Sequence, residues 1–143
     1  MTVARILAAK GRNVVTMEPN RTLAEAAALL TARNIGAAVV TDTQGRVLGM
    51  LSERDILHAV GTGGAAALDD AVARHMTAPV VTTDEDESVQ VAMEKMTVRR
   101  CRHLPVVADE ELVGIVSIGD VVKHRLEQIE HEYQAMRDYI ATA

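Results

Sequence analysis

Apolar and polar positions along the first part of the chain change period several times, and each change predicts a new element. Apolar residues three and four apart predict a helix over 2–10, which Gly11 ends. The same spacing predicts a second helix, which Thr22 caps and which runs to about Asn34. Short apolar runs between turn-forming residues predict strands, and one more helix follows them. These segments are strands over 14–16, 37–41 and 47–51 and a helix over 53–60.

The order strand, helix, strand, strand, helix returns about 66 residues later. Val80-Val81-Thr82 repeats Val14-Val15-Thr16 at an offset of 66, and Ser88 begins a helix as Thr22 does. The second copy is predicted to contain a helix over 70–76, a strand over 80–82, a helix from 88, a strand around 106–107 and a hairpin turn over 109–111. Each copy alone is too small to bury much apolar surface, so we expect two small α/β units that pack face to face and fold together.

One motif occurs in both copies: an apolar run ends at a serine, and an aspartate follows three residues later. The pairs are Ser52 with Asp55 and Ser117 with Asp120. The pattern predicts a buried strand that turns directly into a helix. A helix capping box would explain the pair. A ligand site would explain it as well, because free N–H groups at a helix start attract anions and a carboxylate can bind two hydroxyls. The motif alone favours the cap.

The glycine-rich stretch Gly61-Thr62-Gly63-Gly64 between the copies predicts a linker. It lacks the Gly-Lys-Ser/Thr ending of a phosphate-binding loop. After Asp120 the last helix continues, and its apolar residues follow spacings of four and three. These residues are Val122, Leu126, Ile129, Tyr133, Met136 and Ile140. Such a narrow stripe either packs along its own domain or meets a second subunit, and the periodicity fits both.

Composition excludes several classes of protein. The chain is 48% hydrophobic and 24% charged, which is typical of a globular protein, and it contains no Phe or Trp. Its net charge of −5 has the wrong sign for a nucleic-acid binder. The single Cys101 fits a reducing compartment, and no apolar run reaches the length of a signal or membrane-spanning segment. We therefore expect a cytoplasmic protein without a membrane partner. The scattered histidines predict no metal site.

The doubled motif, with a helix and a hairpin before each copy, resembles the tandem cystathionine-β-synthase (CBS) domain pair, or Bateman module. Other stretches that carry the resemblance are 34–37, 52–56, 75–77 and 102–107. The resemblance covers the chain from about Val3 to Val122 and divides it into a first repeat (1–61), a linker (62–69), a second repeat (70–125) and a C-terminal amphipathic helix (126–143). It implies an α/β (α+β) fold with two pseudo-symmetric repeats, each a small sheet with two flanking helices.

The family resemblance also implies a regulatory function. Such modules bind AMP, ADP, ATP, S-adenosylmethionine or NAD-type cofactors in two clefts between the repeats, where the motif Asp holds the ribose hydroxyls and the segment that leads into the opposite repeat contacts the adenine. One cleft would use Ser52, Arg54 and Asp55 with Thr77, Pro79 and Val80, and the other would use Ser117 and Asp120 with Lys10, Asn13 and Val14.

The two implied clefts differ in their cations. Arg102-His103 stands in the second repeat where the first has Ile35-Gly36, and the resemblance suggests that this basic pair contacts phosphates. Without the resemblance, two solvated surface cations would be the simpler interpretation. The first repeat instead has Arg54 inside its motif, where the second has Gly119.

Three functions compete. We expect a module that senses an adenine nucleotide, most simply AMP, ADP or ATP, and changes its binding to an unidentified protein target. The alternatives are a structural oligomerisation module without ligand, and a binder of NAD(H) or S-adenosylmethionine. We expect no enzyme, because the repeats and tail use the whole chain and no nucleophile–base pair or carboxylate dyad is evident. The apolar tail and the habits of CBS pairs together predict a homodimer.

Overall fold

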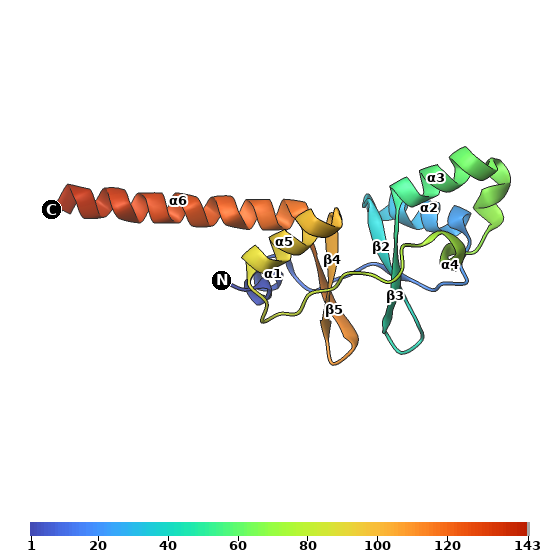
Figure 1. Ribbon diagram of the computed structural model, residues 1–143, viewed down its shortest axis with the longest axis horizontal. Helices are drawn as coiled ribbons and strands as arrows, with labels where there is room; N and C mark the ends of the chain where they lie inside the picture. The colour runs from blue at the N-terminus through green and yellow to red at the C-terminus, as the bar shows by residue number, and fades with distance from the viewer. Residues whose placement is uncertain (143) are drawn as a thin grey trace.

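The computed structural model describes residues 1–142, and its elements follow the predicted repeat (Figure 1). The helices are α1 (Val3–Lys10), α2 (Leu23–Arg33), α3 (Glu53–Gly63), α4 (Val72–His75), α5 (Val89–Arg99) and α6 (Ile118–Thr142), with a 3₁₀ helix η1 (Ala65–Asp69). The strands are β1 (Thr16–Met17), β2 (Ala37–Thr41), β3 (Val47–Ser52), β4 (His103–Ala108) and β5 (Glu111–Ser117). This mixed architecture with its long C-terminal helix confirms the expected fold class.

Each repeat contains an antiparallel hairpin that ends at the motif serine. In the first sheet, β2 pairs with β3 so that Ala37 lies opposite Ser52, and β1 joins β2 in parallel. In the second sheet, β4 pairs with β5 so that His103 lies opposite Ser117. The hairpins therefore correspond residue by residue at their open ends, where the following helices α3 and α6 begin.

The strand expected over 80–82 is not formed, and this prediction was wrong. The backbone reaches the second sheet only at Thr83, whose N–H donates to Pro105 O at 3.0 Å and whose carbonyl accepts from Val107 N at 2.9 Å. The β-branched run favours an extended backbone, but a strand also needs a partner for its hydrogen bonds. The corresponding strand of the first repeat, β1, is formed but is only two residues long, and it starts at Thr16 rather than at residue 14 as expected.

The expected helix caps are present, whereas the glycine-rich segment is not a loose linker. Thr22 and Ser88 each accept the N–H of the residue three positions later, at 3.1 Å. Helix α3 continues through Gly63 and is followed directly by η1. A Cβ on Gly63 would lie 3.4 Å from the Ala67 Cβ, so small residues let η1 pack closely against the end of α3.

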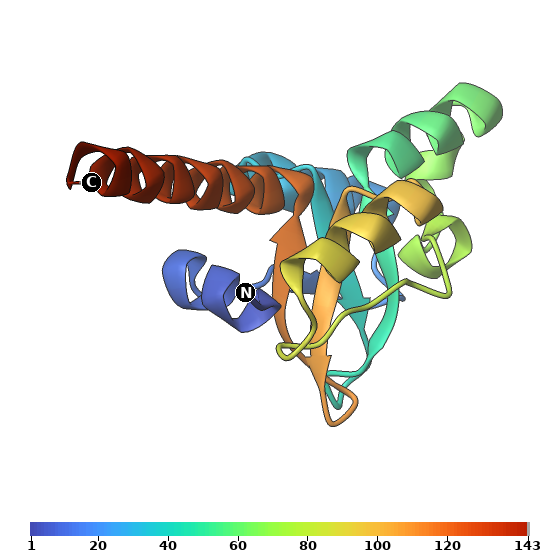
Figure 2. The ribbon, with the colours of Figure 1, turned by 60° about the vertical axis from the view of Figure 1, so that its left-hand side comes forward.

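The leading helices are exchanged between two separate cores. Val3, Ile6 and Leu7 of α1 are buried with α5, β4, β5 and α6 of the second repeat. Val72 of α4 is buried in the core of the first repeat. Figure 2 shows α1, in dark blue, beside β5 and α5. Each repeat thus needs a helix that precedes the other repeat's sheet, and the two repeats form one folding unit.

Backbone hydrogen bonds hold both exchanged segments at equivalent places. Val3 N–H donates to Glu87 O at 2.9 Å, next to the start of α5. Val72 N–H donates to Arg21 O at 2.7 Å, next to the start of α2. Each leading helix is therefore tied to the residues that begin the main helix of the other repeat. Within residues 1–142, no helix combines the length and apolar character needed to cross a membrane.

Candidate functional site

We define two motif sites. The first comprises Ser52, Arg54, Asp55, Thr77, Pro79 and Val80, and the second comprises Lys10, Asn13, Val14, Arg102, His103, Ser117 and Asp120. In each, a strand of one repeat ends beside the segment that leads into the other repeat.

Glycines in β3 and β5 let the leading segments approach the strands. A Cβ on Gly49 would lie 2.6 Å from Met76 Sδ and 2.9 Å from Thr77 O. At the equivalent Gly114, a Cβ would lie 2.8 Å from Leu7 Cδ2. The contact at Gly49 is completed by two backbone hydrogen bonds, because Met50 and Thr77 exchange N–H and carbonyl groups at 3.0 and 2.8 Å. Thr77 is thereby fixed near the strand that ends at the first motif.

Both motifs form caps at the start of a helix. Asp55 N–H donates to Ser52 Oγ at 3.2 Å, and Ser52 N–H donates to Asp55 Oδ2 at 2.9 Å, which completes a capping box. Asp120 N–H donates to Ser117 Oγ at 3.1 Å, and Ser117 N–H donates to Asp120 Oδ2 at 2.9 Å. The cap interpretation is correct for both. A carboxylate has about four acceptor positions, so each cap leaves acceptor capacity for a ligand.

The two carboxylates differ in what else they contact. Lys10 Nζ lies 2.5 Å from Asp120 Oδ2 and also donates to the carbonyl of Ile115 at 3.0 Å. Burial by itself raises the pKa of Asp120, but hydrogen bonds from Lys10 and Ser117 outweigh it and hold that pKa below the usual value. Asp120 is therefore an ionised acceptor at neutral pH. Asp55 makes no ion pair with any residue from 1 to 142.

The basic pair lies at the second site. His103 is half-buried opposite Ser117 in the sheet, and the Arg102 carbonyl accepts from Ile118 N at 2.8 Å. Burial lowers the pKa of His103, and the charges of Lys10 and Arg102 lower it further against the opposing effect of Asp120. The imidazole is therefore neutral at pH 7. A nearby anion would raise this pKa.

The strand registers correct the expected match between the repeats. Because His103 lies opposite Ser117 and Ala37 lies opposite Ser52, the counterparts of Arg102-His103 are Gly36-Ala37, one residue later than the expected Ile35-Gly36. The backbone agrees, since Glu53 N–H donates to Gly36 O at 2.9 Å as Ile118 N–H does to Arg102 O. Under either match, only the second repeat has a basic pair at this place.

Glu53 makes the first site more acidic than the sequence suggested. It follows the motif serine, in the place that Ile118 takes in the second repeat, and a Cβ on Gly36 would lie 3.3 Å from its Oε1. Together with Asp55 it places two carboxylates at the start of α3. Arg54 is exposed and makes no side-chain hydrogen bond or ion pair within the described chain. The signal that could have revealed Glu53 was its position directly after the motif serine.

Some predicted site residues make no hydrogen bond to the motifs. Asn13 and Val14 follow Lys10 without a hydrogen bond to Ser117 or Asp120 among the described residues. Pro79 and Val80 likewise make no hydrogen bond to the first motif, although the neighbouring Thr77 is bonded to β3. Their roles stay predictions that rest on the family resemblance.

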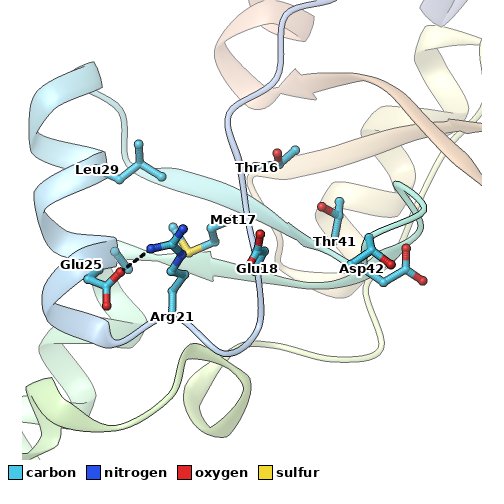
Figure 3. A pocket seen from close by; sticks show the side chains of 10 residues that line it. Thr16, Met17, Glu18, Arg21, Glu25, Leu29, Thr41 and Asp42 are labelled. Atoms are coloured by element: carbon cyan, nitrogen blue, oxygen red, sulfur yellow. Dashed lines mark hydrogen bonds and ion pairs between the residues drawn. The ribbon is translucent and has the colours of Figure 1, made fainter.

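Two hollows of about 500 Å³ lie on the first repeat, and none of the residues predicted from the sequence for the two motif sites lines them. Figure 3 shows the one beside β1 and α2, where Arg21 is paired with Glu25 at 2.9 Å. Glu18 and Asp42 also line it, so its carboxylates outnumber its single cation. This balance disfavours an anionic ligand. The other hollow lies between α2 and α3, against Ile35 and Glu53.

Comparison with known proteins agrees with the doubled architecture. The family model described as the CBS domain matches twice, at residues 8–62 and 71–127. The chain belongs to the CBS domain family. The resemblance to a tandem CBS pair is thereby confirmed, and these two matches correspond to the two repeats.

Solved CBS structures resemble most of the chain. The CBS-domain containing protein ATU1752 from Agrobacterium tumefaciens is 47% identical, with a TM-score of 0.83 over 87% of this chain and 99% of that chain. The CBS domain pair of protein MJ0100, in complex with 5-methylthioadenosine and S-adenosyl-L-methionine, is 28% identical, with a TM-score of 0.79 over 90% and 98%. A CBS domain protein from Pyrobaculum aerophilum complexed with AMP is 32% identical, with a TM-score of 0.75 over 84% and 89%.

Proposed function

We propose that this protein is a regulatory module that binds an adenosine-containing ligand, with an adenine nucleotide such as AMP, ADP or ATP at the second site. The observation that carries the proposal is the ionised Asp120 at the start of α6, beside Lys10 and the Arg102-His103 pair. A carboxylate suits a ribose diol, and three basic side chains suit a phosphate. Structural neighbours in complex with AMP, 5-methylthioadenosine and S-adenosylmethionine support the same ligand class.

Lys10 gives the second site a preference for phosphorylated ligands. A ribose that uses Asp120 must compete with the Lys10 amine, which is paired with this carboxylate in the free protein. A phosphate offers the displaced amine a new anionic partner, whereas adenosine leaves it with water and Ile115 O. AMP should therefore bind with much higher affinity than adenosine. Arg102 and His103 add to that difference because they lie at the same end of the sheet.

The first site differs in charge and is proposed to differ in ligand. Glu53 and Asp55 place two carboxylates around one exposed cation, Arg54, which is unfavourable for a phosphate chain. A positively charged adenosine compound such as S-adenosylmethionine fits this balance better. We therefore propose that AMP fills the second site first, and that the first site is where an alternative ligand of the S-adenosylmethionine type would bind. NAD(H) carries phosphates and belongs with AMP at the second site.

Occupancy is proposed to act on a protein target in the cytoplasm, where the single Cys101 stays reduced. The repeats are held together by the exchanged helices, so a ligand between a strand end and a leading segment contacts parts of both cores. Binding would then stabilise the pair as a whole. A purely structural role without ligand is the competing function.

A calorimetric screen tests the proposal. AMP, ADP, ATP, NAD(H) and S-adenosylmethionine are titrated into the native protein and into Asp120→Asn and Asp55→Asn. We expect AMP to bind the native protein, to bind Asp120→Asn more weakly and to keep its affinity in Asp55→Asn. A melting temperature that rises with AMP in the native protein supports binding to the folded state. If none of the five ligands binds, the structural role is favoured and the proposed function is rejected.

A further inference from the structure

Helix α6 carries a line of apolar side chains that nothing in its own chain covers. The α6 stripe consists of Val122, Leu126, Ile129, Tyr133, Met136 and Ile140, which are between 45% and 68% exposed. Figures 1 and 2 show α6 leaving the folded body and extending freely beyond it. Among the described residues of α6, only Val121 is buried. An apolar stripe with spacings of four and three on a free helix is typical of a helix that pairs with another helix.

Four of the five charges beside the α6 stripe, all except Lys123, are not placed to stabilise α6 itself. Arg125, Glu130, Glu132 and Arg137 are exposed, and none has an opposite charge three or four residues away, where helix neighbours interact. In the described chain, none of them takes part in an ion pair. They flank the stripe on both sides, with Arg125 and Glu132 on one side and Glu130 and Arg137 on the other. Charges at these flanking positions select the partner and the direction of a helix pair.

We propose that a second copy of this chain pairs its α6 with this one in parallel, through the α6 stripe, to form a two-fold symmetric dimer. In this arrangement each stripe residue lies beside its own copy, from Val122 to Ile140. Parallel pairs bring each residue on one flank close to the residue five positions later in the other helix. Arg125 then faces Glu130 of the partner subunit, and Glu132 faces Arg137 of the partner subunit. Symmetry doubles both attractive contacts.

Antiparallel arrangements explain the pattern less well. Full overlap of two antiparallel α6 helices would oppose Glu130 to itself, Glu132 to itself and Lys123 to Arg137, which are three repulsive pairings, and would set Arg125 against the neutral Tyr139. A staggered antiparallel pair, with Leu126 beside Ile129, would restore attraction between Arg125 and Glu132. However, it would place Met136 beside Gly119 of the partner subunit and carry Ile140 past the start of the partner's helix, so that the end of the stripe would lack apolar contacts. The parallel pair covers the whole stripe and also matches the charges.

A charge-reversal cycle, read out by sedimentation equilibrium, tests both pairing and direction. Arg125→Glu and Glu130→Arg should each weaken the dimer by roughly five- to thirty-fold, because each creates two repulsive contacts. The double variant should recover most of the loss, since the exchanged charges attract again in the parallel pair. In the staggered antiparallel pair, the double variant would instead set position 125 against Glu132 and position 130 against Lys123. A double variant weaker than either single variant therefore overturns the parallel pair.

Cysteine cross-linking gives an independent readout on a Cys101→Ser background. Met136→Cys lies in the stripe and should form a disulfide-linked dimer under mild oxidation, whereas the control Gln134→Cys, on the far side of α6, should not. Truncation before Glu127 removes most of the stripe and should also weaken the dimer. A full-length chain that is monomeric at micromolar concentration in light scattering, or equal cross-linking of the two cysteines, would overturn the proposal. None of these results depends on nucleotide binding, so the dimer and the ligand are tested separately.

Discussion

Lys10 Nζ lies 2.5 Å from Asp120 Oδ2 and joins the leading helix of one repeat to the motif carboxylate of the other. Both side chains are partly exposed, so the pair contributes only modestly to stability. Its greater effect concerns binding, since the carboxylate that the proposed ribose needs is already paired in the free protein. The matching carboxylate Asp55 has no such partner among residues 1–142. In the free protein, the motif carboxylate is therefore ion-paired at the second site but not at the first.

Removing the Lys10 amine should improve adenosine binding and weaken the preference for AMP. Lys10→Met keeps most of the side-chain volume but leaves Asp120 unpaired and free for a diol. We expect adenosine to bind about three- to tenfold more tightly, and the ratio of AMP to adenosine affinity to fall by about tenfold or more. Calorimetry measures both. The control is Arg33→Met, an exposed cation in the last turn of α2 and outside the site; an equal change in both variants would contradict the role of Lys10.

AMP should bind with much higher affinity than 2′-deoxy-AMP, because the deoxy analogue leaves a carboxylate acceptor of Asp120 partly unpaired. The loss of one charge-assisted hydrogen bond costs on the order of 1.5–3 kcal/mol, or about ten- to a hundredfold in affinity. Asp120→Asn should reduce binding of AMP and leave a folded protein, since the Asn Oδ1 can still accept from the Ser117 N–H. Competition titration distinguishes the two nucleotides. Equal affinity for both would reject the carboxylate as the ribose ligand.

His103 should make AMP binding depend on pH. Its pKa is lowered in the free protein, chiefly by burial, and a bound phosphate would raise it, so that binding takes up a proton. AMP affinity should therefore increase between about pH 7.5 and 6, by at most tenfold per pH unit. The phosphate of AMP itself titrates near pH 6. Titration of the AMP phosphate affects the affinity of His103→Asn in the same way. The difference in pH dependence between the native protein and His103→Asn therefore measures the contribution of the histidine.

The same histidine predicts the opposite trend for stability without ligand. A folded state that lowers a pKa binds fewer protons than the unfolded chain, so its contribution is present above the ordinary histidine pKa and is lost as the pH falls through the lowered value. Between about pH 7 and 5.5, the native protein should lose stability relative to His103→Asn. Urea unfolding at several pH values measures this. If the free energies of unfolding of the two proteins changed with pH in the same way, the pKa of His103 would not be lowered by folding.

Gly49→Ala should destabilise the protein, because the new Cβ would lie 2.6 Å from Met76 Sδ and 2.9 Å from Thr77 O. Backbone cannot move away as a flexible side chain can, so we expect a loss of about 1–3 kcal/mol. Gly61→Ala is the matched control. It lies within α3 with no atom within 4 Å of the added Cβ, and alanine should stabilise the helix by about 0.5–1 kcal/mol. Thermal or urea unfolding compares the two.

The fragment Met1–Gly61 should be unfolded alone, or should pair with a second copy of itself. It contains α1, whose apolar face is buried in the core of the other repeat, and it lacks α4, which fills its own core. Circular dichroism and sedimentation measure the result. A cooperative, monomeric fragment would show that the repeats are independent domains.

Local signals predicted much of the fold. Thr22 and Ser88 cap their helices as the capping residues indicated, and β2 has the expected bounds. The doubled motif also predicted both strand-to-helix transitions. These features depend on a few neighbouring residues, so the sequence alone contains the information.

Features that depend on distant partners could not be predicted in the same way. The run Val80–Thr82 has strand-forming residues, but only Thr83 finds hydrogen-bonding partners at the sheet edge. The segment expected to be flexible at Gly63 is helical because η1 packs against it through Ala67. The ion pair of Lys10 follows from the exchange of the leading helices, which no local pattern encodes.

Helix α6 begins at the second site and continues unbroken for 25 residues, from Ile118 to Thr142. With a rise of roughly 1.5 Å per residue it is about 37 Å long, so a tilt of about 5° at its base would move its tip by about 3 Å. Asp120 lies in the first turn, at the base of this helix. A rearrangement around its carboxylate that tilted the helix, such as one that followed the release of Lys10, would therefore displace the far end of α6 by several times as much as its base.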